Sequence, residues 1–274
     1  MSALLGDTPQ RDYARKLSLF NRFAAAELRT AVARLGIVPG MRVLDAGCGA
    51  GETLQLLAAA AGPQGLVAGV DLAAAHTTAA RAANAPATLI VQGNLARPPF
   101  AAGRFDLIWC ANTINHLHDP GATLAQLRGL LTAGGRIALA QSSMLPDMYF
   151  AWDERLERAV TAAVRRYYRE RYGLAEEATT GIRALVGLVR AAGFANVRAD
   201  TLAIERVAPL GGADVDYLFE AIFSGTWGAR LAPYLSSADY ARVQLLCNPD
   251  APEFALRRPD FHFLQTLTVV TGSL

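Results

Sequence analysis

Three glycines at alternate positions follow an apolar run in the segment VLDAGCGAG, residues 43–51. The apolar run is typical of a buried strand, and the glycines allow a tight turn that larger residues would hinder. In a sheet of parallel strands, a turn from a strand into a helix lies at the carboxyl edge, where ligands bind. The segment therefore predicts a ligand-binding turn at Gly47, Gly49 and Gly51.

The residues after this turn disfavour phosphate-bearing ligands. A P-loop needs a lysine and then a serine or threonine, whereas Glu52 and Thr53 follow Gly51 here. A dinucleotide-binding turn needs a third glycine at position 52. Glu52 instead places a carboxylate at the helix terminus that a pyrophosphate would occupy. The turn is thus a poor match for ATP, NAD and FAD.

Two acidic residues point to a different ligand. Asp45 lies two residues before the first glycine, and a carboxylate there suits a ligand that carries an ammonium group. S-adenosyl-L-methionine (SAM) is such a ligand. Asp71 ends the next apolar run, VAGVDL, 24 residues after Gly47, a distance that suits a ribose of either SAM or a dinucleotide.

At this point the segment VLDAGCGAG resembles the first signature of class I SAM-dependent methyltransferases. The resemblance extends from residue 38 to residue 142, through VAGVDL, VQGNLARPPFAAGRFDLIWC, ANTINHLHDP and LLTAGGRIALAQ. It implies that Asp71 accepts hydrogen bonds from both ribose hydroxyls. Asn94 stands where the family usually has an aspartate facing the adenine amino group, and an amide oxygen can accept that bond too.

The resemblance also implies a set of cofactor-binding residues. Tyr13 belongs to it through an N-terminal helix that covers the cofactor in many relatives, although packing against Phe20 and Phe23 is an equal alternative. The full set is Tyr13, Asp45, Ala46, Gly47, Gly49, Asp71, Leu72, Asn94, Leu95, Ala111 and Asn112.

His116 and His118 are the candidate catalytic residues, since a histidine is a natural base near neutral pH. A base is needed only when the nucleophile arrives protonated. The alternatives are a structural role for His116 and capping of the following helix by His118. Cys48, Cys110 and Cys247 lack metal-ligand spacing, so neither a metal site nor a disulfide framework is expected.

The elements that position these residues alternate between apolar runs and helical stretches over residues 41–141. Short apolar strands separated by helices are typical of a parallel sheet covered on both faces. The predicted fold is a doubly wound α/β domain with a mostly parallel seven-stranded sheet. Residues 1–36 are predicted to form N-terminal helices, and residues 37–143 the SAM-binding core.

Residues 144–274 are predicted to form a helical substrate lid, together with the last core helix and strands at about 178–205 and 261–273. Sixteen of the 22 aromatic residues follow residue 148, so the lid is suited to an apolar or ring-bearing substrate. The alternative is that the rings fill the core of this part. The candidates are Tyr149, Phe150, Trp152, Tyr217, Phe223 and Trp227. A charged stretch, residues 165–169, is interpreted as a solvated helix face.

The composition argues against two classes of partner. With 26 basic and 24 acidic residues, the formal charge of +2 gives no field that would attract nucleic acid or an anionic membrane. No apolar run reaches the length of a membrane span, and the N-terminus lacks the core of a signal peptide. We therefore expect a cytoplasmic protein; its oligomeric state is left open.

The leading functional hypothesis is a SAM-dependent methyltransferase that modifies an oxygen or nitrogen of a small molecule, in specialised metabolism. A C-methyltransferase similar to quinone-pathway enzymes is the nearest alternative, and it would need a base beside an activated ring carbon. A non-catalytic SAM-binding protein is a third possibility. An NAD-dependent oxidoreductase ranks last because of Glu52 and Asp45.

Overall fold

The computed structural model describes residues 14–85, 88–143, 148–150, 152–173, 175 and 182–274. The chain divides into two compact units, each discontinuous in sequence. Its described residues in the ranges 14–142, 182–202 and 267–274 form the sheet unit. Its described residues in the ranges 143–175 and 203–266 form the helical unit.

The sheet unit is built on parallel strands in the order β3-β2-β1-β4-β5, with β8 antiparallel to β5 and β7 pairing with β8. The strands are β1 (Arg42–Ala46), β2 (Leu66–Asp71), β3 (Leu89–Gln92), β4 (Phe105–Ala111), β5 (Leu131–Ser142), β7 (Ala195–Val207) and β8 (His262–Ser273). The strand order reverses between β1 and β4, which places the topological switch point of the sheet beside the glycine turn. The predicted doubly wound α/β fold is confirmed, but the sheet has eight strands in the described residues where seven were predicted.

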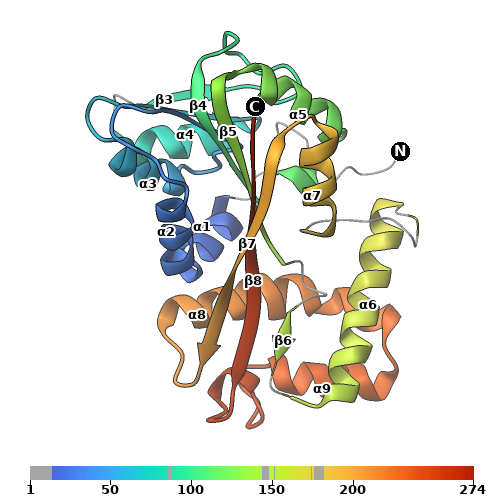
Figure 1. Cartoon of the computed structure of the whole chain (residues 1–274). Helices are drawn as coiled ribbons and strands as arrows, with labels where there is room; N and C mark the ends of the chain where they lie inside the picture. The colour runs from blue at the N-terminus through green and yellow to red at the C-terminus, as the bar shows by residue number, and fades with distance from the viewer. Residues whose placement is uncertain (1–13, 86–87, 144–147, 151, 174, 176–181) are drawn as a thin grey trace. The chain divides into compact units, whose positions relative to one another are not determined.

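Helices cover both faces of this sheet (Figure 1). On one side lie α1 (Ala14–Phe23), α2 (Ala25–Arg34), α3 (Glu52–Ala61) and α4 (Ala74–Ala83). On the other lie α5 (Pro120–Gly129) and α7 (Ile182–Ala191). With both faces covered, the strands become continuously apolar, as the sequence indicates.

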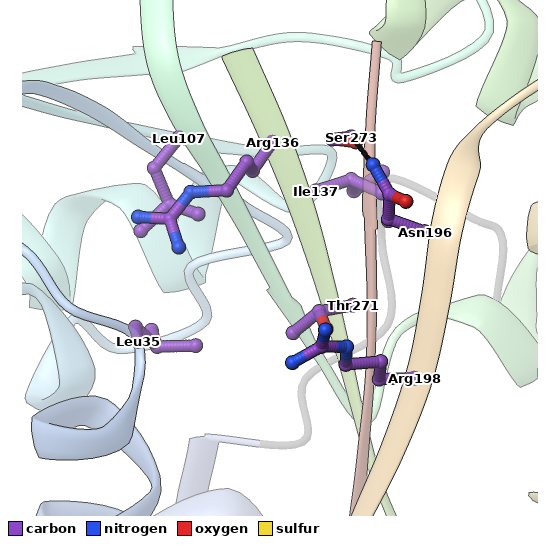
Figure 2. A pocket seen from close by; sticks show the side chains of 9 residues that line it. Leu35, Leu107, Arg136, Ile137, Asn196, Arg198, Thr271 and Ser273 are labelled. Atoms are coloured by element: carbon purple, nitrogen blue, oxygen red, sulfur yellow. Dashed lines mark hydrogen bonds between the residues drawn. The ribbon is translucent and has the colours of Figure 1, made fainter. Parts of the chain in front are cut away.

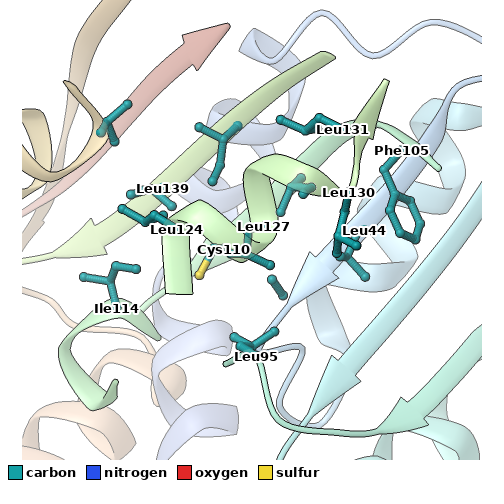
Figure 3. Packing of buried hydrophobic residues seen from close by; sticks show 14 of the residues in the cluster. Leu44, Leu95, Phe105, Cys110, Ile114, Leu124, Leu127, Leu130, Leu131 and Leu139 are labelled. Atoms are coloured by element: carbon teal, nitrogen blue, oxygen red, sulfur yellow. The ribbon is translucent and has the colours of Figure 1, made fainter. Parts of the chain in front are cut away.

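The core between the sheet and α5 consists of closely packed aliphatic side chains (Figure 3). Leu44, Ile108, Leu124 and Leu127 are all completely buried in it. Each fully buried side chain of this size contributes roughly 1.5–3 kcal/mol relative to an exposed one. The core thus fixes the carboxyl ends of β1 and β4, from which the site residues extend.

The helical unit contains a short strand, β6 (Tyr149–Phe150), which pairs with Phe263 and Leu264 of β8 and is an eighth strand that the sequence did not predict. Its helices are α6 (Glu154–Tyr172), α8 (Gly212–Asp216), the π-helix η3 (Tyr217–Trp227), η4 (Ala229–Tyr234), α9 (Ser237–Cys247) and η5 (Ala255–Arg257). Asp153 caps α6 by accepting a hydrogen bond from the Leu156 N–H at 2.7 Å.

Aromatic rings form the core of the helical unit. The Phe150 ring lies with its centroid 4.9 Å from each of the rings of Trp152 and Trp227, and Phe223 lies 5.6 Å from Trp227. Phe150, Phe223 and Trp227 are buried, as is Tyr217, whereas Tyr149 is exposed. These rings therefore pack mainly against one another, which is the core alternative considered from the sequence.

The charged stretch of α6 forms salt bridges at the surface. Arg166 donates to the Glu170 carboxylate at 2.8 Å, and the Tyr234 hydroxyl donates to the same carboxylate at 2.8 Å. The side chains of Arg166 and Glu170 are both largely exposed. Exposed pairs of this kind contribute about 0–1 kcal/mol.

Among the described helices, none combines the length and the apolarity needed to cross a bilayer. The three cysteines are buried free thiols. The described residues contain no cluster of histidine, cysteine or acidic side chains that could hold a metal ion.

Candidate functional site

The glycine turn joins β1 to α3 and depends on glycine for two reasons. Gly47, Gly49 and Gly51 have φ angles of +86°, +53° and +88°, which L side chains rarely adopt. In addition, a Cβ atom on Gly47 would lie 2.2 Å from Thr113 Oγ1. The N–H groups of Gly47 and Cys48 donate to the Val70 carbonyl at 2.8 and 3.0 Å, so the turn is fixed to the end of β2.

Glu52 occupies the position from which the sequence argued against a pyrophosphate. It is the first residue of α3, directly after the cap residue Gly51, and its Oε2 accepts a hydrogen bond from Asn21 Nδ2 at 3.2 Å. A carboxylate at this helix terminus interacts favourably with the helix dipole and repels an anionic ligand. The position therefore favours a ligand without phosphates.

Asp45 provides a buried carboxyl group before the turn. Asp45 is 2% exposed, and its Oδ2 atom has no hydrogen-bond partner in the described part of the chain. Burial, the Asp71 carboxylate and Glu52 raise the pKa of Asp45 to about 8. A cationic group bound beside Asp45 would supply the missing partner and favour its ionised form.

Asp71 lies at the end of β2 and bridges the turn to the start of α4. Its Oδ2 accepts from the Gly49 N–H at 2.9 Å, and its Oδ1 accepts from the Ala73 N–H at 2.9 Å. Burial alone would raise the pKa of Asp71, but hydrogen bonds from His76 and these two backbone amides outweigh burial and lower it. Asp71 is thus held as a carboxylate next to Asp45, whose carboxyl favours the protonated form.

His76 is a site residue that the sequence analysis missed. It is 6% exposed on the inner side of α4, and its Nδ1 lies 3.1 Å from Asp71 Oδ1. The helix AAHTTAARAA, residues 74–83, has little contrast between polar and apolar faces, so its pattern does not indicate that position 76 faces inward. The five-residue spacing from Asp71 was the available signal.

Asn112 begins the turn after β4 and connects it to the end of β5. Its φ angle is +49°, and its Oδ1 accepts from Gln141 Nε2 at 3.1 Å, Ser142 N at 2.8 Å and Ser142 Oγ at 2.9 Å. The oxygen is therefore occupied. The side chain of Asn112 can therefore offer a ligand its amide NH₂ group, while its oxygen connects the ends of β4 and β5.

Gln141 is a second residue that the sequence analysis missed. Its side chain is 3% exposed, and Nε2 donates to Asn112 Oδ1, whereas Oε1 lacks a partner among the described residues. A buried acceptor without a donor costs about 1–3 kcal/mol. Gln141 Oε1 thus remains a buried, unpaired acceptor at the end of β5 among the described residues.

The two candidate catalytic histidines differ in their surroundings. His116 is half-buried in the short helix η1 (Ile114–His116), three residues after Thr113, whose Oγ1 lies 3.5 Å from the Gly47 carbonyl oxygen. His118 is exposed. The cap of α5 is Asp119, whose Oδ1 accepts from the Ala122 N–H at 2.8 Å, so His118 does not have the capping role considered from the sequence.

The remaining predicted cofactor residues lie at or near the carboxyl ends of the strands. Asn94 is exposed, and its Oδ1 already accepts from the Ala96 N–H at 2.8 Å, which leaves that oxygen one further lone pair for an adenine amino group. Leu95 is buried, Leu72 half-buried and Ala46 fully buried, and Ala111 ends β4. Tyr13 lies outside the described residues.

A hollow of ≈ 440 Å³ in the sheet unit lies away from these residues (Figure 2). Leu107, which lines it, pairs with Val43 near the beginning of β1, so the hollow is displaced from the carboxyl edge. Its other lining residues are Leu35, Arg136, Ile137, Asn196, Arg198, Thr271, Gly272 and Ser273. No predicted site residue contributes to it.

Residues 44–139 match the family described as "Methyltransferase domain". This segment is therefore similar to a methyltransferase domain. The cofactor of such methyltransferases is S-adenosyl-L-methionine. This agrees with the ligand that Glu52, Asp45 and Asp71 favour in the sequence. The matched segment contains the glycine turn, Asp71, His76, Asn112 and both candidate catalytic histidines.

Curated relatives share this domain with the chain. The nocamycin O-methyltransferase of Saccharothrix syringae is 39% identical over 37% of this chain and 38% of that protein. The 2-phytyl-1,4-naphtoquinone methyltransferase of Thermosynechococcus vestitus is 35% identical over 41% of this chain and 51% of that protein. The chain thus spans only a third to a half of the length of such relatives.

Solved structures extend the similarity of fold beyond the matched segment. The YcgJ protein of Bacillus subtilis superposes with a TM-score of 0.53 at 15% identity, covering 91% of this chain and 98% of that one. A SAM-dependent methyltransferase of Aquifex aeolicus gives a TM-score of 0.50 at 18% identity, covering 69% and 91%. At these identities the likeness concerns the fold.

Proposed function

We propose that this protein transfers a methyl group from SAM to an oxygen or nitrogen of a small, partly apolar or aromatic molecule. The observation that carries the proposal is the pairing of two largely buried carboxyl groups, Asp45 and Asp71, around a glycine turn without phosphate-binding features. The methyltransferase domain at residues 44–139 supports the reaction class.

The residues present fit SAM chemically. Asp45 Oδ2, buried without a partner among the described residues, suits the ammonium group of the methionine part. Asp71 retains one acceptor position, on Oδ2, for the ribose hydroxyls after its bonds to Gly49, Ala73 and His76, because a carboxylate has about four acceptor positions.

The chemistry that SAM supplies is a methyl group on a positively charged sulfur, which is already an activated leaving group. The protein's own contribution is then to bind, to orient and to exclude water. When the acceptor is a hydroxyl, His116 or His118 would take its proton on an imidazole nitrogen. When the acceptor is an amine with a free lone pair, no base is required.

The acceptor class is inferred from two sources. The printed names of the curated relatives include methyltransferases for nocamycin, aklanonic acid and a phytyl naphthoquinone, all of them small molecules. The second source is the aromatic enrichment after residue 148, where Tyr149 is an exposed ring. The quinone-type relatives also favour C-methylation as the second candidate.

Calorimetric titration tests the cofactor. We expect the protein to bind SAM and S-adenosylhomocysteine but neither NAD nor ATP, and we expect Asp71→Ala to lose this binding. Asp200→Ala, which removes an exposed carboxylate paired with Arg34, is the matched control and should bind as the wild type does. Selective binding of NAD, or no binding of SAM, would overturn the proposal.

Methyl transfer is tested with acceptor panels and SAM labelled with ¹³C at the methyl group. A mass gain of one methyl group identifies turnover, and the ¹³C chemical shift of the product assigns the methyl to oxygen, nitrogen or carbon. We expect His116→Ala and His118→Ala to retain SAM binding, because neither belongs to the cofactor set. Loss of SAM binding in either variant would show that these roles are misassigned.

A further inference from the structure

His76 is buried against the residue that the proposed function assigns to the ribose. Its side chain is 7% exposed and that of Asp71 is 14% exposed, with Nδ1 and Oδ1 3.1 Å apart. An ionised carboxylate can only accept hydrogen bonds, so the proton lies on Nδ1 of His76. Hydrogen bonds between a donor and a charged acceptor are the stronger kind, and burial strengthens them further.

The other two bonds to Asp71 do not fix the carboxylate as His76 does. The backbone N–H of Gly49, in the glycine turn, holds Oδ2, and the backbone N–H of Ala73, at the N-cap of α4, holds Oδ1. His76 extends from the first turn of α4, where the helix itself fixes the imidazole. His76 is therefore the side chain that links the orientation of the carboxylate to a regular element.

The neighbouring acid makes this link necessary. Asp45 and Asp71 repel each other, and both are desolvated. A hydrogen bond from His76 stabilises the negative charge at Asp71, while Asp45 Oδ2 has no donor among the described residues. The arrangement separates the two carboxyl groups into one that favours the charged form and one that favours the protonated form.

We propose that His76 is a positioning residue, which holds the Asp71 carboxylate by donation from Nδ1 to Oδ1 so that the open acceptor position on Oδ2 faces the ribose hydroxyls of the cofactor. This inference rests on the proposed function, because it takes Asp71 as the ribose ligand. The role of His76 is specific to one part of the cofactor. Its removal should weaken binding through the ribose and leave the contacts to the methionine and adenine parts intact.

An imidazole at this position could alternatively serve packing alone. His76→Leu keeps an apolar side chain of similar bulk and removes the donor, whereas His76→Asn keeps an N–H donor at about the same distance from Cα as Nδ1. A packing role predicts that leucine is the better substitute. A positioning role predicts that asparagine restores what leucine loses.

Titration with two ligands distinguishes these roles. The probes are S-adenosylhomocysteine and its 2′,3′-dideoxy counterpart, which lacks the hydroxyls that face Asp71. We expect His76→Leu to bind S-adenosylhomocysteine about tenfold to a hundredfold more weakly than the wild type, the range of one charge-assisted hydrogen bond. We expect the dideoxy ligand to bind wild type and His76→Leu within about twofold, and His76→Asn to recover most of the loss.

The control for the substitution itself is His262→Leu. His262 also pairs with a carboxylate, its Nε2 lying 2.8 Å from Glu205 Oε1, but both side chains are about half exposed and belong to the helical unit. We expect His262→Leu to bind both ligands as the wild type does. Circular dichroism spectra and melting temperatures verify that each variant folds.

A spectroscopic readout reports on the pair without any ligand. In protein with ¹⁵N-labelled histidine, we expect Nδ1 of His76 to carry a proton protected from exchange, because the imidazole is buried against Asp71. We also expect its resonance to shift in Asp71→Asn. An unprotonated Nδ1 facing Asp71 would overturn the hydrogen bond on which the inference depends.

The binding outcomes separate this inference from the proposed function. Suppose that the wild type binds S-adenosylhomocysteine, and that His76→Leu weakens the binding of both ligands equally or the binding of neither ligand. The positioning role is then wrong, and the proposed function stands. If the wild type binds neither ligand, the proposed function fails, and the role of His76 toward a ribose fails with it.

Discussion

Asp45 and Asp71 are two largely buried carboxyl groups beside one turn, and their pKa values shift in opposite directions. Asp45 Oδ2 has no hydrogen-bond donor among the described residues, and the pKa of Asp45 is raised to about 8 by burial first, then by Asp71 and Glu52. Asp71 has three donors, and its pKa is lowered in spite of burial. Such shifts are typical of functional sites, because a fold gains no stability from a desolvated carboxyl group without a donor.

The pH dependence of stability tests the state of Asp45. Between pH 6 and pH 8 the folded protein holds a proton at Asp45 that the unfolded chain has lost, so stability falls as pH rises. We expect the wild type to lose about 2 kcal/mol of unfolding free energy over this range relative to Asp45→Asn. Urea unfolding at both pH values measures the difference.

Asp106 provides the control for this experiment. Hydrogen bonds from Arg42 lower the pKa of Asp106 to about 2, so Asp106 is ionised in both folded and unfolded chains above pH 6. Asp106→Asn should therefore reduce stability by the same amount at pH 6 and pH 8. Equal pH dependence in the wild type and Asp45→Asn would contradict the buried, protonated state of Asp45.

Gly47→Ala tests the close contact between the glycine turn and Thr113. The new Cβ would lie 2.2 Å from Thr113 Oγ1, at a φ of +86°. We expect a loss of about 2–4 kcal/mol in stability, combining backbone strain with a clash in a packed region, and a loss of SAM binding. Thermal unfolding and titration measure the two effects.

Gly40→Ala separates the two causes, because Gly40 has a φ of +90° and open space around its Cβ position. It should show the cost of backbone strain, about 1–2 kcal/mol, and no loss of SAM binding. If Gly47→Ala were no worse than Gly40→Ala, the contact with Thr113 would not constrain the turn.

At the scale of elements, Asn112 connects the end of β4 to the end of β5 through one oxygen with three donors. Asn112→Ala removes the acceptor and leaves an alanine at a φ of +49°. We expect a loss of about 2–4 kcal/mol, from unpaired donors and from strain. Asn112→Gly should be less destabilising by about 1 kcal/mol, since glycine accepts this φ.

Asn112→Asp is the matched control for this connection, because it retains an oxygen acceptor at the same place and tolerates the same φ. Chemical denaturation measures the free energy of unfolding of the three variants. We expect Asn112→Asp to be the most stable, Asn112→Gly to be intermediate and Asn112→Ala to be the least stable. Should alanine and aspartate be equally stable, the hydrogen bonds to Gln141 and Ser142 would not hold the two strand ends together.

Most of the elements of the sheet unit could be predicted from the sequence, because both the strands and the covering helices have clear patterns. The run VLDAG became β1, and the acidic residues at positions 45 and 71 reached the same edge. His76 and Gln141 could not be predicted, since inward orientation in an alanine-rich helix and an unpaired amide oxygen depend on tertiary packing. The π-helix at 217–227 likewise has no sequence signal of its own.

The role of the aromatic residues could not be predicted from the sequence. Their enrichment after residue 148 predicts a lid, yet composition does not separate rings that line a pocket from rings that fill a core. Phe150, Phe223 and Trp227 pack against one another within the helical unit. The acceptor class therefore depends mainly on the relatives.

At the scale of the whole molecule, neither unit is continuous in sequence, and the last residues of the chain complete the sheet unit. The segment 267–273 of β8 pairs antiparallel with β5, from Leu267 opposite Ser142 to Ser273 opposite Arg136. Leu267 and Val270 are completely buried. The methyltransferase core at 44–139 accordingly depends on residues more than a hundred positions away.

Deletion of residues 267–274 tests this dependence. It would leave β5 unpaired on one side and expose the apolar side chains that Leu267 and Val270 cover. Loss of two such buried side chains alone costs about 4–10 kcal/mol, comparable to the whole stability of a typical domain. We expect the truncated protein to lose cooperative unfolding and SAM binding together. Deletion of Leu274 alone, which removes an exposed residue bound by one backbone hydrogen bond to Gly135, should preserve both. A truncated protein that still unfolded cooperatively and bound SAM would mean that the parallel strands β1 to β5 form the site without the C-terminal strand.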